Sequence, residues 1–287
     1  MIDYDPHQWR TTFFSVRGSM LGVIAFRSLM VTISAVVVTW VHFNVYAFAL
    51  ANATAVHASV GTALGLLLVF RTNQSYDRWW EGRKLWGAMV NTCRNLARTT
   101  SVHLAGQPER LRQVLALTQS FPSAAMCVLR HKAWAPSGLE PEDVDAVTSH
   151  NHAPTAICQR LTFHLDQERK AGRLSDIVFT SLDHDTHQLV DIIGGCERIH
   201  KTPLPFAYVV HLRRALVLYC ATLPFPLVGI FGWATVPVVF GVSYIMLGIE
   251  EIGVEIEDPF EGDANDLPLE RITDGIQNGV GSYLPRG

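Results

Sequence analysis

Two long segments without a charged side chain constrain this chain most strongly. Ser28–Phe70 and Ala215–Ile249 contain no Asp, Glu, Lys or Arg. A helix that crosses the apolar core of a bilayer needs about 20 predominantly apolar residues. The first segment is about twice that length, so we expect it to hold two crossings joined by an outer turn within Asn44–Thr54. The chain is therefore predicted to be an integral membrane protein.

The second uncharged segment forms a hairpin only if its ends extend into Phe206–Arg214 and Glu250–Ile256. Pro224 and Pro226 interrupt it, because each proline removes a hydrogen-bond donor and disfavours helical backbone at the residue before it. Within a membrane such breaks are tolerated only where protein or water satisfies the freed backbone groups. We therefore expect this hairpin to pack inside an assembly, which gives four transmembrane helices per subunit.

Basic residues flank both segments, whereas the two presumed outer turns carry none. The flanking residues are Arg10, Arg17, Arg27, Arg71, Arg78, Arg83, Lys84, Lys201, Arg213 and Arg214. Basic residues concentrate on the cytoplasmic side of membrane proteins. No cleavable signal peptide is expected at Met1–Arg10. We predict a multi-pass protein of the cell inner (plasma) membrane with both termini and the middle of the chain in the cytoplasm.

Residue patterning divides the chain into four parts and predicts an all-α fold. The parts are 1–70, an amphipathic N-terminal segment and the first hairpin; 71–205, a cytosolic helical domain; 206–256, the second hairpin; and 257–287, a cytosolic acidic segment and tail. No run of alternating residues indicates a sheet. The expected cytosolic helices are a continuation of the second crossing from about Val56 to about Thr99, Glu109–Cys127 ending early at Pro122, Pro154–Ala171 and Leu174–Ile199. Gly275–Gly287 is expected to be a loose tail.

Composition excludes several function classes. Charged residues make up 17% of the chain, against roughly 25% in average soluble domains. The net charge of −3 and the lack of a basic stripe argue against a nucleic-acid partner. The five cysteines share no CxxC spacing, so a disulfide framework or zinc ribbon is not expected. No nucleotide-binding glycine loop, GxSxG or HExxH occurs, and the chain is not expected to be an enzyme.

Aromatic and charged residues crowd the stretch Arg71–Gly87, where the second crossing leaves the bilayer. Its Trp and Tyr residues are typical of a membrane–water interface. The density of Asp77, Arg78, Glu81 and Arg83 also favours a helix that is packed on several faces. From the residues alone, an interfacial belt with solvated charges explains most of the pattern.

The sequence SYDRWWEGRKLWG at residues 75–87 resembles the signature of the bestrophin family. Phe14–Ser19, Pro203–Tyr208 and Asp258–Leu269 resemble three further bestrophin segments, so the likeness covers nearly the whole chain. The resemblance implies a homopentameric ion channel in which the second crossing, from about residue 56, surrounds a central pore. An apolar neck would lie in the membrane, above a cytosolic vestibule with a second constriction at its exit.

By this resemblance the pore neck falls on Thr62, Leu66 and Phe70, and the exit constriction on Ile177. The three neck positions are spaced i, i+4 and i+8, so they share one face of a helix. Rings of apolar side chains gate by dewetting. The family usually carries a larger apolar residue in place of Thr62, whose hydroxyl should widen and wet the outer end. Read without the family, the same positions fit a lipid-facing or helix-packing stripe.

The acidic segment after the second hairpin could hold a hard cation, because such ions prefer carboxylate and carbonyl oxygens. The resemblance places Asp263 and Asp266 on carboxylate positions of the calcium clasp of animal bestrophins, and Glu255 and Asp258 on its backbone-carbonyl positions. This chain is less acidic there than the animal relatives, and a solvated acidic surface is the simpler interpretation. The histidine-rich stretches 150–152 and 183–187 could bind a transition metal, but exposed histidines are more common. We therefore expect that no cofactor is required and assign no metal site. The less favoured alternative is that the protein binds calcium or zinc.

The predicted function is passive conduction of monovalent ions through a homopentamer, with membrane lipid and the permeant ions as the other partners. Animal relatives pass anions and bacterial relatives are associated with cations. The acidic residues and net charge lean towards Na+ or K+ over chloride. The alternative is a membrane-anchored helical sensor or scaffold that binds a cytosolic partner. A coupled transporter would need a buried ionisable residue, and the uncharged segments offer only His42 and His57.

Overall fold

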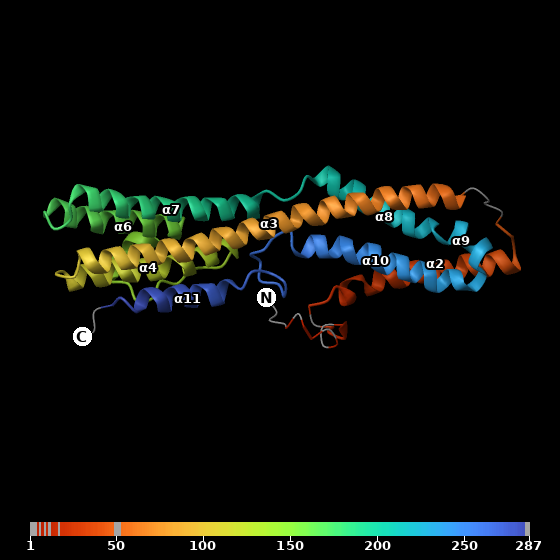
Figure 1. The fold of residues 1–287 in the computed structure, drawn as a ribbon, viewed down its shortest axis with the longest axis horizontal. Helices are drawn as coiled ribbons and strands as arrows, with labels where there is room; N and C mark the ends of the chain where they lie inside the picture. Colours follow the sequence, from red (N-terminus) through yellow and green to blue (C-terminus); the bar gives the residue numbers. More distant parts are fainter. Residues whose placement is uncertain are drawn as a thin grey trace. The chain divides into compact units, whose positions relative to one another are not determined.

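The computed structural model describes residues 5, 7–8, 10, 13–16, 18–48 and 53–284. Within those ranges all regular structure is helical and no strand occurs, which confirms the all-α prediction (Figure 1). Part of the predicted outer turn, residues 49–52, lies outside the described residues. The helices are α2 (Leu21–Asn44), α3 (Ala53–His103), α4 (Pro108–Leu129), α5 (Pro141–Thr148), α6 (Ala153–Lys170), α7 (Asp176–Lys201), α8 (Phe206–Thr222), α9 (Pro224–Phe231), the short 3₁₀ helix η1 (Gly232–Ala234), α10 (Thr235–Glu255) and α11 (Leu269–Gly281).

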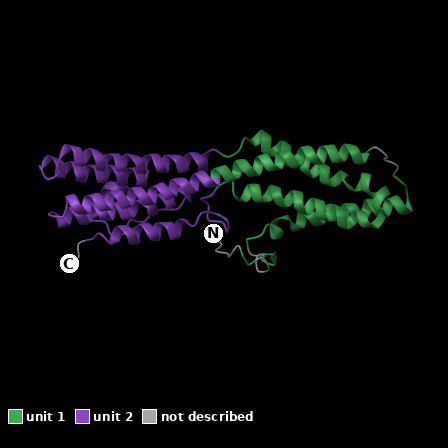
Figure 2. Cartoon of the chain, in the orientation of Figure 1, with its two compact units in different colours: residues 1–78, 203–258 green, residues 79–202, 259–287 purple. Residues whose placement is uncertain are grey.

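The chain divides into two compact units (Figure 2). Unit 1 comprises residues 1–78 and 203–258, and unit 2 comprises residues 79–202 and 259–287. Both uncharged segments belong to unit 1. The division falls inside α3, beyond the predicted boundary at residue 70, and the buried Arg71 binds Glu250 within unit 1. As the sequence predicted, the second crossing continues without a break into the helix that follows it.

Three helical segments of unit 1 are long and apolar enough to cross a membrane by length and composition: Leu21–Asn44, Ala53–His103 (which extends into unit 2) and Phe206–Glu255. The third is not one straight helix. Leu223 separates α8 from α9 ahead of Pro224, as expected from the prolines. The chain then reverses at Gly232, whose φ of 53° favours glycine, and α10 returns against α8 and α9.

The apolar core of unit 1 joins α3 to α8, α2 and α10. Its buried residues are Ile24, Leu64, Leu68, Leu212, Leu216, Cys220 and Leu247. Gly61 allows a close approach, since a Cβ there would lie 2.6 Å from the Tyr219 hydroxyl oxygen. A Cβ on Gly65 would meet nothing within 4 Å. Gly61 therefore allows close helix packing, whereas Gly65 has open space beside its Cα atom.

Unit 2 is a helical bundle in which α4 packs against α6, α7 and α11. Trp86, Phe121 and Leu189 belong to its fully buried core. Pro122 lies inside α4, so the early end predicted for this helix is wrong. The proline forfeits one backbone hydrogen bond. Continuing the helix buries Phe121 and Ala125 completely, and this burial offsets the loss.

The loose tail predicted for Gly275–Gly287 is wrong over residues 275–281, which belong to α11; residues 285–287 lie outside the described residues. The helix forms because it buries one face against α4. Gln119 and Gln277 also exchange side-chain to backbone hydrogen bonds of 2.8 and 3.3 Å. The buried positions repeat with a helical period: Leu269, Thr273, Ile276 and Val280.

A buried charged cluster ties α4, α5 and α6 together in unit 2. His164 is 2% exposed, and its Nδ1 contacts the guanidinium of Arg110. Because that group only donates, the proton lies on Nε2, which donates to Asp143 Oδ1 at 2.8 Å. Arg160 also binds Asp143, and Glu168 binds Arg110. Burial lowers the pKa of His164, although its bond to Asp143 acts in the opposite sense.

Candidate functional site

One face of the unit 1 part of α3 is apolar and has no partner among the described residues of the chain. Leu66 is 56% exposed and Phe70 is 54% exposed, and Thr62 is also exposed. On the opposite face Leu64 and Leu68 are buried in the core of unit 1. Exposed apolar surface of this kind marks a protein, membrane or channel surface. The structure thus brings the three predicted neck residues onto one free face.

Polar side chains continue this face past Phe70. Asn73 and Asp77 are both exposed, and they follow Phe70 by three and seven residues, which keeps them on the same side of a helix. At the other end, the Thr62 hydroxyl donates to the Ala58 carbonyl at 2.9 Å. Its hydrogen is therefore engaged within the helix, and only its oxygen is left to accept from water.

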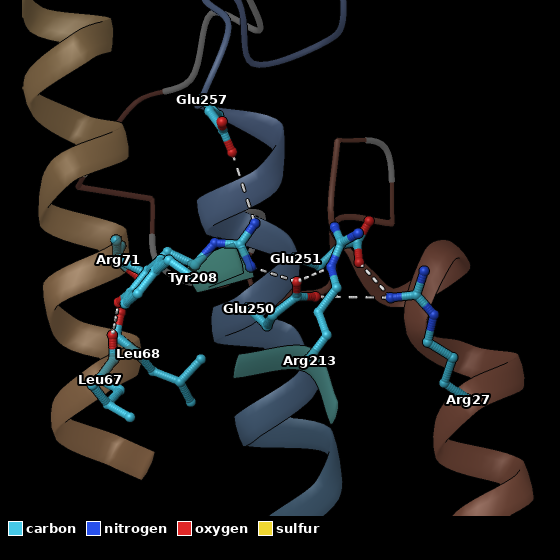
Figure 3. A network of polar contacts seen from close by, with 10 residues as sticks. Arg27, Leu67, Leu68, Arg71, Tyr208, Arg213, Glu250, Glu251 and Glu257 are labelled. Atoms are coloured by element: carbon cyan, nitrogen blue, oxygen red, sulfur yellow. Dashed lines mark hydrogen bonds and ion pairs between the residues drawn. The ribbon is translucent and has the colours of Figure 1, made fainter. Parts of the chain in front are cut away.

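Immediately after Phe70, the packed side of α3 is fixed by a buried charge network (Figure 3). Arg71 is 1% exposed and Glu250 is 2% exposed. Arg71 Nη1 donates to Glu250 Oε1 at 2.7 Å, and Arg213 Nε donates to the same oxygen at 2.8 Å. Arg27 binds Glu251 at 2.7 Å, and Arg71 Nη2 lies 3.8 Å from Glu257. Arginines from α2, α3 and α8 thus converge on carboxylates at the end of α10 and just after it.

Sequence reasoning did not find this network. Its signal was present, because basic residues end the uncharged segments and Glu250 follows the second directly. Burying a charge is costly unless it is paired and hydrogen-bonded. Pairing Arg71 with Glu250 therefore fixes how α3 meets α10. Tyr208 adds a further link, since its hydroxyl donates to the Leu67 carbonyl at 3.0 Å.

The charges of the SYDRWWEGRKLWG stretch are distributed over several faces, as their density indicated. Arg78 Nε donates to the Glu257 backbone carbonyl at 2.8 Å in unit 1. In unit 2, Glu81 accepts from Arg198 at 2.6 Å. A Cβ on Gly82 would come within 3.0 Å of Phe260, so the glycine admits the aromatic ring against α3. Residues of this stretch therefore hold α3 against its neighbours, in addition to supplying the aromatic side chains typical of a membrane–water interface.

The four residues of the predicted cation site fall in different units, Glu255 and Asp258 in unit 1 and Asp263 and Asp266 in unit 2. Asp266 is 1% exposed, and its Oδ2 accepts from the backbone N–H groups of Gly262 and Asp263 at 2.7 and 2.8 Å. This carboxylate orders the loop that precedes α11. The cation site stays a prediction.

The described part of the chain contains no group of three or more His, Cys, Asp or Glu residues placed to hold a metal ion. Among the histidines singled out by sequence, His152 caps α6 by accepting from the Thr155 N–H at 3.3 Å. His184 lies 3.1 Å from the Gln188 side chain. These contacts give two of the histidines local roles.

Ile177, the predicted exit residue, lies in the first turn of α7 and is 83% exposed. The helix starts at this point because the Ser175 hydroxyl accepts from the Val178 N–H, an N-cap. An isoleucine exposed to this degree is available to face a partner or a pore. The assignment as an exit constriction stays a prediction.

The family of the chain follows from its sequence as a whole. The model of the family described as "Bacterial/Fungal Bestrophin protein" matches residues 1–282. The chain belongs to the bestrophin family. Its resemblance to bestrophins, seen first in four short motifs, is thereby confirmed. Bestrophins are ion channels rather than enzymes, and the apolar helices agree with a membrane protein.

This bestrophin is similar to several bacterial proteins. It is 39% identical to the "Voltage-dependent anion channel-forming protein sll1024" of Synechocystis sp., over 95% of this chain and 90% of the relative. It is 31% identical to the "Voltage-dependent anion channel-forming protein YneE" of Escherichia coli, over 96% and 92%. The crystal structure of a bacterial bestrophin homologue from Klebsiella pneumoniae superposes with a TM-score of 0.85 at 30% identity, over 92% of this chain and 99% of that one.

Proposed function

We propose that this bestrophin conducts monovalent ions passively through a central pore formed by five copies of the chain. Each subunit would cross the membrane four times, with α2, α3, α8 together with α9, and α10. The observation that carries the proposal is the free apolar face of α3, with Leu66 and Phe70 more than half exposed. In a bilayer an isolated subunit would turn this face towards lipid, whereas a ring of subunits turns it towards a shared axis.

Thr62, Leu66 and Phe70 would form three stacked rings that make the neck. An ion cannot replace its hydration shell with hydrocarbon, so apolar rings close the pore by excluding water. The core contacts of Leu64 and Leu68, together with the Arg71–Glu250 ion pair, hold the opposite side of α3 in place. This support favours a gate that opens by small helix movements. Ile177, exposed at the start of α7, would line the cytosolic exit.

The other exposed apolar side chains of unit 1 suit contact with lipid or neighbouring subunits. On α2 they include Phe26, Leu29, Ile33 and Trp40. Arg27 and Arg71 lie at the ends of the crossings. Basic residues at these ends favour placing both termini in the cytoplasm, with the protein in the inner membrane. Among permeant ions we favour Na+ and K+ over chloride, although the relatives above carry anion-channel names.

Ion flux through purified protein in liposomes tests the proposal. Leu66→Ala removes the bulk of one ring and should raise flux severalfold over the wild type. Leu29→Ala is a matched control, since Leu29 is 53% exposed but lies on α2, away from the proposed pore. Equal flux in all three proteins would contradict the neck. A particle mass in detergent equal to one or two chains would contradict the channel assembly and favour a scaffold.

A further inference from the structure

The charged side chains that follow the neck on α3 lie on different faces of the helix according to their sign. Arg71 points into the core of unit 1 and is bound by Glu250. Arg78 is half-buried and donates to the Glu257 carbonyl. Asp77 is exposed, and the ion pairs described around it join other residues, Arg71 with Glu250 and Arg198 with Glu81. The first basic groups after the neck are therefore turned towards protein, while the first carboxylate is turned away from it.

Helix geometry places Asp77 on the same face as the neck. It follows Phe70 by seven residues, which is about 10 Å along the axis and within about 20° of the same direction. Between them Asn73 is exposed and uncharged. Glu81, which is bound by Arg198, and Lys84 are the next charged residues in this direction, about 6 Å and about 10 Å further along the helix. Asp77 is thus the charged group nearest to the neck on this face.

We propose that Asp77 determines the charge preference of the permeating ion. The inference rests on the proposed function, because it needs five copies of α3 around a pore. Five carboxylates would then form a ring at the inner mouth of the neck, where they concentrate monovalent cations and repel anions. The ring would lie about one Debye length from Phe70 at physiological salt, so its influence should weaken as salt concentration rises.

A structural role for Asp77 makes a different prediction. If its carboxylate served only to bind an arginine of a neighbouring subunit, removing the charge would weaken the assembly and leave ion preference unchanged. Asp77→Asn keeps the shape of the side chain and removes the charge. Asp145→Asn is the matched control, because Asp145 is also exposed but lies on α5 in unit 2.

The test measures reversal potentials of the purified channels in planar bilayers under a KCl gradient. Asp77→Asn should lower the permeability ratio of K+ to Cl− severalfold, Asp77→Lys should lower it further, and both shifts should be larger at low salt. Asp145→Asn should match the wild type. Current in every variant with an unchanged ratio would overturn the role of Asp77 while leaving the channel intact. No current in the wild type would instead overturn the proposed function, and particle mass in detergent shows whether a variant still assembles.

Discussion

Glu250 is the residue whose charge we expect to matter most for the stability of unit 1. Its Oε1 accepts charge-assisted hydrogen bonds from Arg71 at 2.7 Å and from Arg213 at 2.8 Å. Glu250→Gln preserves the size of the side chain but removes the negative charge. Among the described residues, Arg71, which is 1% exposed, then keeps only Glu257 at 3.8 Å as a nearby carboxylate.

The expected cost follows from burial. Removing one partner of a buried ion pair destabilises a protein by about 3–5 kcal/mol, because the remaining charge is left uncompensated. The amide oxygen of Gln still accepts a hydrogen bond, so we expect the lower limit, about 3 kcal/mol. At about 2–4 °C per kcal/mol, the unfolding midpoint should fall by about 6–12 °C.

Glu251→Gln is the matched control on the same helix. Its partner Arg27 is half exposed, and exposed ion pairs contribute only about 0–1 kcal/mol. Thermal unfolding of purified protein in one detergent, at one scan rate, gives the comparison. Equal midpoints for the two variants would refute the reasoning. The double variant Arg71→Met with Glu250→Leu should recover much of the loss, since it removes both buried charges.

Three further predictions concern helix packing and pH. Gly61→Val should lower the unfolding midpoint through overpacking, which typically costs about 1–3 kcal/mol, and Tyr219→Phe should restore part of it by removing the hydroxyl that a Cβ would meet at 2.6 Å. Burial lowers the pKa of His164 below its unfolded value of about 6.5. Its contribution to stability is therefore complete above that value and declines as the pH falls below it. His164→Gln should flatten this dependence in pH-series unfolding experiments, and an unchanged slope would contradict the assignment. Ile276→Ala should cost about 2–5 kcal/mol if α11 packs as described, whereas the exposed Asn278→Ala should be nearly silent in the same denaturation assay.

Much of the fold could be predicted from the sequence, because the decisive signals are local. The lack of charge over Ser28–Phe70 predicts helices long enough to cross a membrane. No breaker separates the second crossing from residues 71–99, and α3 is indeed continuous from Ala53 to His103. The two wrong predictions, an early helix end at Pro122 and a loose tail from residue 275, also came from local sequence. Pro122 and the glycines of residues 275–281 are poor helix residues, and only burial against neighbouring helices outweighs their propensities.

The candidate site could be predicted only in part. Family resemblance proposed Thr62, Leu66 and Phe70, but all sides of this crossing are apolar in sequence. Nothing in the sequence alone distinguishes the face that Leu64 and Leu68 bury from the face that stays free. Asp77 and Arg78 are likewise adjacent and both charged, yet Arg78 is half-buried and donates to the Glu257 carbonyl, whereas Asp77 stays exposed.

The uncharged segments by themselves indicated helices long and apolar enough to cross a membrane, and the motifs indicated the family. Hydrophobic length is a sum over neighbouring residues, so no tertiary information is needed to read it. The tertiary structure decided which face of α3 is packed and which carboxylate receives Arg71. Those outcomes depend on contacts such as Arg71–Glu250, between residues 179 positions apart. Pairing at that distance is chosen by how helices pack and by the cost of an unpaired buried charge, and neither is encoded in local sequence.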